Sequence, residues 1–591
     1  MPVEQQNNRE RYRKIQLPVG SAEFWLERAG PRVTFHTTQP NGNGWGQWPR
    51  CGSDACLGEA VIGNLCFRHS PSAARAQYVT GLLDGVLQVR LSGVDLLPDV
   101  ALELIRYLGG NERRMRAALS FFGADVGTRL EFEGYNFDHW IHFGGATFRE
   151  ALSFRKCVFN QSLTGHYAFF NGGPPVFWNC EFHEDVNLSY VHAERVSIGF
   201  DHCVFHKSCN LDGVSAPLLF KECEFKSDLS ISNADAPIIN LDHCSIAGEL
   251  SVAGTRCQGF NADYLKGPRI SQIGPIEVTN HCKISHARFD TRVRIEIKAD
   301  QLDLGGTQVL QGGHVSVERA RLLLNGLSSG APLRISGVVG STAPPAILSL
   351  QDADAGSMSF AHLDMSRCIF YGSNDVAEAI VEPTVSFAIS PHFWRTKRKC
   401  VADEFAWRRN ASALYAWGWR LPGSVLTSEE QRKPGHENEV LLPSLRASQV
   451  AAVYRDLRSS FEARSDRPGA ADFYYGEMEM RRHSDEFGVA ERSIITMYWL
   501  LSGYGLRAWR SFAWLFTLVI GGGIATARWG LVDGPVPSRV GILLSVRAMI
   551  PALHRNVELT RAGSILEIAI TLLGPVLLAL AILALRGRVK R

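Results

Sequence analysis

Phenylalanine recurs between residues 130 and 159 at a spacing that neither a single helix nor a single strand produces. The steps alternate between five and six positions, which gives an eleven-residue unit carried by Phe132, Phe137, Phe143, Phe148, Phe154 and Phe159. An amphipathic helix buries a side chain about every 3.6 residues, and a half-buried strand buries every second one. A fixed period with one large apolar side chain per short stretch instead predicts a solenoid, whose stacked turns bury the repeated side chains together.

A series of cysteines accompanies the phenylalanines. Each cysteine stands two positions before an aromatic or aliphatic residue, and the series recurs every 20 to 23 residues at Cys157, Cys180, Cys203, Cys223 and Cys244. That interval is about two eleven-residue units, so every turn would direct phenylalanines and one small cysteine inward. Stacked thiols could bind a metal or become oxidised, but a buried cysteine usually packs as a small apolar side chain. We therefore interpret both series as core.

Ala-Thr-Phe at residues 146–148 and the Cys-x-Phe series resemble the repeats of the pentapeptide-repeat family. In that family a central leucine or phenylalanine faces the axis of a right-handed, four-sided parallel β-helix, and a small residue stands two positions earlier. The resemblance covers residues 130–372, is clear as far as residue 253 and degenerates afterwards. It implies a mainly β chain built on a pentapeptide-repeat solenoid, of which the eleven-residue unit would be a looser variant.

Three cysteines and a histidine stand close together near the N-terminus in the spacing C-x4-C-x9-C-x2-H, namely Cys51, Cys56, Cys66 and His69. Three thiolates and one imidazole form a complete tetrahedral ligand set for Zn2+, so the ion would be structural, with no position open for catalysis. The spacing resembles small treble-clef-like zinc knuckles, and the alternative is four unrelated residues. The segments 96–110 and 111–122 that follow are expected to be helices that cap the first turn.

Two uncharged apolar runs near the C-terminus, residues 511–527 and 568–585, are 17 and 18 residues long. Each is near the minimum of about 17–20 residues for a helix that crosses a bilayer. A pair of buried core helices is the alternative, but two such apolar runs close together are difficult to bury inside a soluble domain. Arg507, Arg510 and the basic run 586–591 flank the pair. The positive-inside rule places both flanks, and the N-terminal soluble region, in the cytoplasm of an inner or plasma membrane protein that contacts lipid.

The connection between the runs contains a third apolar stretch, residues 540–554, which is too short to cross and is interrupted by Arg547. It could be a re-entrant helix that lines a pore or an interfacial helix that lies flat on the bilayer, and the sequence leaves both open. Glu567 stands at the edge of the second run. Charges at membrane depth usually face a pore or a partner helix. Arg547 and Glu567 are therefore candidate pore residues.

A helical spacing of apolar residues, followed by a Pro-Gly turn, predicts an αα-hairpin before the first run: Val450, Tyr454, Leu457 and Phe461. Carboxylate pairs at residues 403–404 and 477–479 are expected to lie on solvated helix faces. The whole order resembles that of bacterial pentapeptide-repeat membrane proteins. The predicted domains are an N-terminal region with the zinc knuckle at 51–69 and a helical cap (1–127), the solenoid (128–374), an irregular linker (375–445), the hairpin (446–490) and the two-span region (491–591).

The sequence contains no P-loop, nucleophile elbow, paired-glycine dinucleotide motif or zinc-protease helix, so we do not expect an enzyme. A polysaccharide-acting β-helix enzyme is the weakest alternative. The net charge of +3 gives no signature of nucleic-acid binding. The leading hypothesis is a membrane sensor or effector whose spans oligomerise into a pore. The competing hypothesis is a passive scaffold, anchored at the membrane, whose solenoid displays a surface to a protein partner.

Overall fold

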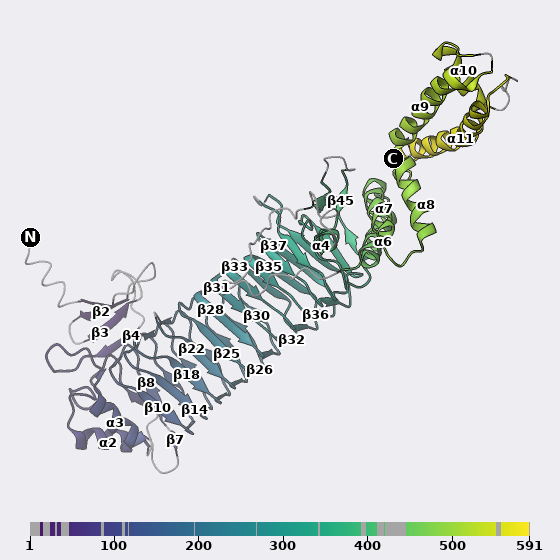
Figure 1. Ribbon diagram of the computed structural model, residues 1–591. Helices are drawn as coiled ribbons and strands as arrows, with labels where there is room; N and C mark the ends of the chain where they lie inside the picture. Colours follow the sequence, from purple (N-terminus) through teal and green to yellow (C-terminus); the bar gives the residue numbers. More distant parts are fainter. Residues whose placement is uncertain are drawn as a thin grey trace, which may run out of the picture. The chain divides into compact units, whose positions relative to one another are not determined.

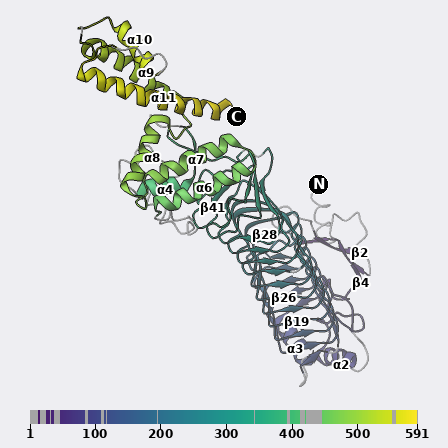
Figure 2. The same cartoon turned by 90° about the vertical axis from the view of Figure 1, so that its right-hand side faces the viewer.

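The computed structural model describes a large part of the chain in two compact units. The described residues are 12–15, 24–29, 32–36, 46–83, 88–108, 113–115, 117–193, 195–267, 269–340, 343–391, 397–410, 419, 445–532, 534–550 and 557–589. One unit comprises Met1–Ile347 with Ser357–Leu363, and the other comprises Leu348–Gly356 with Asp364–Arg591. We call them the first unit and the second unit (Figures 1 and 2).

The first unit begins with an antiparallel sheet and two helices. The strands follow each other in the order β1 (Tyr12–Ile15), β2 (Phe24–Ala29), β3 (Arg32–His36) and β4 (Gly46–Pro49). The helices α2 (Ser72–Leu83) and α3 (Pro98–Leu108) pack against each other. α3 starts at a proline and directs one apolar stripe inward, formed by Val100, Ala101, Leu104 and Leu108. This spacing is the pattern of an amphipathic helix.

The parallel coil starts earlier than residue 128. The segment 111–122, expected to be a helix, contains β7 (Arg114–Met115) and β8 (Ala118–Ser120) where the structure describes it. β8 pairs in parallel with β5 (Gln88–Arg90) on one side and with the next turn of the coil on the other. The expectation of a helix is wrong because the stacking of neighbouring turns outweighs the helix propensity of this short stretch.

One turn of the coil passes through four parallel sheets. β10 (Leu130–Glu133), β11 (Asn136–Phe137), β12 (Ile141–His142) and β13 (Thr147–Phe148) each belong to a different sheet. β14 (Leu152–Arg155) then returns to the sheet of β10 and pairs with it in parallel. The first unit is therefore a parallel β-solenoid, visible in Figure 1 as a stack of short arrows.

The repeated phenylalanines form stacked columns inside the coil. The rings of Phe132 and Phe154 lie 5.1 Å apart between centroids, and those of Phe137 and Phe159 lie 4.9 Å apart, both nearly parallel. Phe148 stacks in the same way on the next turn, 5.0 Å from Phe170. All of these side chains are buried. The register pairs each ring with the residue one turn further on, which explains why two eleven-residue units make one turn.

Phe143 departs from this stacking. It is buried, but the residue one turn further on is Gly165, and a Cβ atom there would lie 2.0 Å from the Phe143 ring. Phe143 instead contacts Phe148 edge-on, with 5.7 Å between ring centroids. A glycine is therefore required beside Phe143, and the phenylalanine series follows three columns with one exception.

The five cysteines of the repeat are all buried, and four of them share one contact. The thiol of Cys157 donates to the backbone carbonyl of Phe132 at 3.4 Å, and the thiol of Cys180 donates to that of Phe154 at the same distance. Cys203 and Cys223 repeat the contact on the following turns at 3.4 Å, and Cys244 is buried beside them. Each thiol therefore pairs with the backbone of the coil, as packing residues do.

The second unit is mainly helical and contains the last turns of the coil. β44 (Ala388–Ile389) and β45 (Lys399–Cys400) pair antiparallel. The helices that follow are α4 (Ala402–Asn410), α6 (Ala447–Ala463), α7 (Arg467–Arg482), α8 (Val489–Ser502), α9 (Ala508–Ala525), α10 (Ser538–Ala548) and α11 (Arg561–Val589). A π-helical turn, η2 (Thr526–Gly530), continues α9. The described part of the segment 375–445 is thus structured, whereas residues 392–396, 411–418 and 420–444 of the expected linker lie outside the described residues.

α6 and α7 form a close αα-hairpin, which Figure 2 shows side by side. Asp466 caps α7 by accepting a hydrogen bond from the backbone N–H of Gly469 at 3.1 Å. A Cβ atom at Gly476 would lie 2.5 Å from the ring of Tyr454, so glycine is needed where the two helices approach. Phe461 and Phe473 contact each other between the helices, with 5.0 Å between ring centroids.

Candidate functional site

The four predicted metal ligands converge in the first unit. The Cys56 and Cys66 sulfurs lie 3.8 Å apart, and the His69 Nδ1 atom lies 3.4 Å from Cys66 Sγ and 3.6 Å from Cys51 Sγ. All four donor atoms lie within 4.8 Å of one another. Zn–S bonds of about 2.3 Å and Zn–N bonds of about 2.0 Å give tetrahedral edges of about 3.5–3.8 Å. The cluster therefore has the size of a tetrahedral metal site.

Two tight backbone segments position these ligands. The backbone N–H of Cys66 donates to Cys51 Sγ at 3.3 Å, and that of Gly58 donates to Cys56 Sγ at 3.4 Å. Such N–H contacts stabilise thiolates. A Cβ atom at Gly58 would lie 2.9 Å from the Cβ of Cys66, so glycine lets the two ligand segments approach. The sequence motif thus folds into a closed Cys3His group that can hold a metal ion.

The contact between Cys56 and Cys66 shifts the pKa values of the two thiols in opposite directions. A hydrogen bond from the Cys66 thiol lowers the pKa of Cys56 to about 5 and raises the pKa of Cys66. The thiolate is the form of cysteine that binds metals. One cysteine of the pair is therefore prepared as a ligand, and an ion would displace the proton held by the other.

Two helices of the second unit are long and apolar enough to cross a membrane. The candidate spans are Ala508–Gly530 and Arg561–Leu585, and only 28% of each apolar window is buried. Large apolar side chains point outward on both helices, with 68% exposure at Phe516 and 65% at Leu572. Because a buried core helix would cover such side chains, the two helices lack the burial expected of a soluble core.

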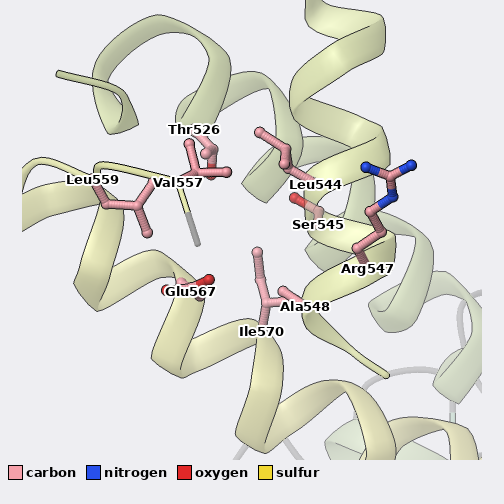
Figure 3. A pocket seen from close by; sticks show the side chains of 9 residues that line it. All are labelled: Thr526, Leu544, Ser545, Arg547, Ala548, Val557, Leu559, Glu567 and Ile570. Carbon is pink, nitrogen blue, oxygen red and sulfur yellow. The ribbon is translucent and has the colours of Figure 1, made fainter. Parts of the chain in front are cut away.

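A small pocket between α9, α10 and α11 brings the two candidate pore residues to one place. Its volume is about 30 Å3, and its lining includes Thr526, Ser545, Arg547 and Glu567. Figure 3 shows the Glu567 side chain on the pocket's α11 side and the Arg547 guanidinium directed away from it. The pocket has room for about one or two water molecules, so the described residues of a single chain enclose no passage there.

Close glycine contacts hold α10 against the first candidate span and the two candidate spans against each other. A Cβ atom at Gly541 would lie 2.1 Å from the Gly523 carbonyl oxygen, and one at Gly563 would lie 2.1 Å from the Gly530 carbonyl oxygen. Small residues permit such backbone contact between membrane helices. α10 has 11 residues, which is too short to cross a bilayer. Residues 551–556 of the predicted apolar stretch lie outside the described residues.

The carboxylates at 403–404 lie in a buried charged network, which the sequence did not predict. Glu404 is fully buried and accepts hydrogen bonds from Arg398 at 2.6 and 2.8 Å. It also accepts from Arg408 at 2.7 and 2.8 Å and from the Tyr454 hydroxyl at 2.5 Å. Asp403 accepts backbone N–H groups at 2.8 and 3.0 Å, and burial raises the pKa of its carboxyl to about 6.

The second carboxylate pair, on α7, is buried at Glu477 and half-buried at Glu479. Glu477 is 2% exposed and pairs with Arg458 at 2.6 Å. Glu479 pairs with Arg482 at 2.8 Å, and despite burial a hydrogen bond from His483 and the charges of neighbouring arginines keep the pKa of its carboxyl below its usual range. The expectation of solvated helix faces is therefore wrong for both pairs. Arg408 and Arg482 stand within four residues of the glutamates that they contact. The contacts of Tyr454 with Glu404 and of Arg458 with Glu477 instead join distant parts of the sequence, so local spacing did not reveal that the pairs are removed from solvent.

Neither a protein-family model, nor a curated protein, nor a solved structure matches this chain. The functional argument therefore depends on the sites of the chain itself. These are a closed Cys3His group, a parallel solenoid, a buried charged network and two exposed apolar helices.

Proposed function

We propose that this chain is a membrane-anchored repeat protein, whose helices α9 and α11 cross the bilayer. The observation that carries the proposal is the exposed apolar surface of both helices. Only 28% of the apolar window of each helix is buried. Water disfavours such a surface by roughly 25 cal/mol for each exposed Å2, and lipid removes this cost. The lipid chains of the membrane are therefore the first partner of this protein.

The solenoid is of the right-handed pentapeptide-repeat type in this proposal and lies in the cytoplasm of a bacterial cell. The sequence resemblance supports the family, and the stacked phenylalanine and cysteine columns are the packing that the family implies. Basic residues on the flanks of the spans support the orientation. The solenoid displays a surface to a protein partner and carries out no catalysis, and we expect no nucleic-acid partner.

The Cys3His group holds a structural Zn2+ in this proposal. Three thiolates and an imidazole favour zinc among the common metals, and the donor separations match a tetrahedron of zinc bonds. The four ligands leave no position for a substrate. The ion would stabilise the small segment between Cys51 and His69, which is held by turns and isolated bridges and contains no helix or strand.

A pore formed by several copies is the more specific function that we propose for the spans. Thr526, Ser545 and Glu567 form polar lining between helices whose outer faces are apolar. Polar groups at this depth are typical of pathways for ions or of helix–helix contacts. Because one chain encloses no passage, the pore requires a homo-oligomer. The competing function is a passive scaffold, which needs the same spans as an anchor only.

Extraction of membranes tests the anchor directly. The full chain should remain with membranes after washes with high salt and with carbonate, which release peripheral proteins. A chain that ends after Ser484 keeps α6 and α7 but lacks both spans, and it should be soluble. A full-length chain released by the wash would show that α9 and α11 do not cross the bilayer.

A further inference from the structure

Two histidines and a glutamate meet on the outer surface of two neighbouring solenoid turns. β19 (Glu181–Phe182) pairs in parallel with β23 (Val204–Phe205), and Phe182 lies opposite Phe205. Both phenylalanines are buried, so the residues beside them in the strands point outward. His183 and His206, which follow these phenylalanines, therefore lie next to each other with Glu181 beside them.

The three donor atoms already lie close to the spacing that one metal ion requires. The Nε2 atom of His206 lies 2.7 Å from Glu181 Oε1, and the Nε2 atom of His183 lies 3.7 Å from the same oxygen. All the donor atoms lie within 4.8 Å of one another. Metal bonds of about 2.0–2.1 Å place neighbouring ligand atoms about 3–3.4 Å apart. Small rotations of the three side chains are therefore sufficient.

We propose that Glu181, His183 and His206 bind a divalent first-row transition-metal ion, for which Zn2+ is the reference. Two imidazoles and a carboxylate suit zinc, copper and nickel, and they leave at least one coordination position open. Water or a donor group of a bound molecule fills that position. The site thus differs from the Cys3His group, whose four ligands fill a tetrahedron.

The packing of the coil does not require this cluster. In the same column, the turn before His183 carries Asn160 and the turn after His206 carries Lys226. In the column of Glu181, the neighbouring turns carry Val158 and Val204. The coil therefore accepts neutral, charged and apolar side chains at these positions, and the two imidazoles meet the glutamate at one place in this stack.

Binding of the ion should change the stacking of the His183 and His206 rings. The two imidazole rings stack at 4.6 Å between centroids, with 22° between their planes. Lone pairs of parallel rings point in parallel directions, so the rings must tilt toward each other to share an ion. The side chains are 40% exposed at His183, 26% at His206 and 43% at Glu181, which leaves room for this movement.

Calorimetric titration of the full chain in detergent tests the proposal, with Zn2+ as the probe after the Cys3His group has been loaded. The native chain should bind one further ion, and binding should weaken toward acid because ligand imidazoles must lose their protons. The variants His206→Gln and Glu181→Gln should lose this ion. His202→Gln is the matched control. His202 also contacts carboxylates, but these are Asp201 and Glu222, which lie outside the proposed site, so this variant should leave the affinity unchanged.

Co2+ provides a second measurement that separates the two metal sites. An ion bound by nitrogen and oxygen ligands gives visible absorption without the strong thiolate charge-transfer bands of a Cys3His site. This spectrum should appear in the native chain and in His202→Gln and be absent from His206→Gln. The proposal is overturned if the zinc-loaded native chain binds no further ion, or if His206→Gln and Glu181→Gln bind it as tightly as the native chain does.

Discussion

The cysteines of the repeat and those of the Cys3His group form two groups, and the contacts of their thiols distinguish the groups. Four of the five repeat thiols donate to phenylalanine carbonyls of the coil, as Cys180 does to Phe154 at 3.4 Å. The sulfurs of Cys56 and Cys66 instead face each other and His69. A position that recurs at every turn serves packing, whereas an isolated group of mixed ligands has the geometry of a metal site. The sequence already distinguishes the two groups, because only the repeat cysteines recur at the length of one turn.

Zinc content tests the role of the isolated group. The purified chain should hold one zinc ion tightly, and Cys56→Ser or Cys66→Ser should abolish it, as measured by elemental analysis after dialysis. Hydrogen exchange of residues 51–69 should become faster in these variants, because the ion stabilises the segment. Cys180→Ser is the control and should keep the zinc, since its thiol lies in the solenoid. A metal-free native chain of unchanged stability would contradict the site.

Substitutions at Phe148 and Arg149, which are neighbours at the end of β13, test whether the phenylalanines form a packed interior. Phe148→Ala should lower the local free energy of unfolding by about 3–5 kcal/mol, because it removes a buried ring and leaves a cavity. Arg149→Ala should cost at most about 1 kcal/mol, since the Arg149 side chain is 60% exposed and only forms a surface ion pair with Asp125. Hydrogen exchange of the adjacent strands measures both changes. Equal effects would show that the interior is not stacked.

At the scale of elements, the buried charged network connects parts of the second unit that are far apart in sequence. Glu404 of α4 contacts Arg398, which precedes β45, and the Tyr454 hydroxyl of α6. Glu479 of α7 contacts Arg408 of α4 at 3.8 Å and the Tyr504 hydroxyl that follows α8. Removing one member of a buried network leaves its partners unpaired, which is costly. The network therefore fixes how α4, α6, α7 and α8 are arranged.

Asp403, next to Glu404 on α4, gives the stability of the second unit a defined dependence on pH. Burial raises the pKa of its carboxyl to about 6, above the unfolded value of about 3.9. Between these values the folded chain binds more protons than the unfolded chain, so this group lowers stability as pH rises from about 4 to 6. The effect amounts to at most about 3 kcal/mol. Asp403→Asn should remove this component from the free energy of unfolding measured against pH, and an unchanged pH dependence would contradict it.

Local patterns predicted some elements and missed others for physical reasons. The helical spacing of Val450, Tyr454 and Leu457 predicted a helix, and α6 buries all three side chains. The phenylalanine period predicted a solenoid, and the chain forms a parallel one. The strands in segment 111–122 and the buried Glu404 were missed, because both depend on partners that are brought together only by folding.

At the scale of the molecule, the two candidate metal sites differ in how their residues are brought together. The Cys3His ligands fall within one short segment, so the sequence alone predicted their grouping. Glu181, His183 and His206 come from two turns, and only the register of β19 with β23 brings them together. The signal that could have found them is the length of one turn, which relates residue 183 to residue 206. Clusters on a solenoid surface can be predicted from the sequence once the number of residues in one turn is known.

The spans provide the test of whether this protein opens the membrane or is only anchored in it. A pore needs several copies, because the pocket shared by Arg547 and Glu567 is about 30 Å3 in one chain. Purified protein in bilayers should therefore be oligomeric and conduct ions, and Arg547→Glu and Glu567→Ala should alter the conductance without preventing insertion. Arg539→Glu is the matched control, because Arg539 is exposed on the same helix, α10, and does not line the pocket. A monomeric protein whose bilayers stay silent would favour the scaffold, since an anchor requires the apolar faces of α9 and α11 but no polar lining.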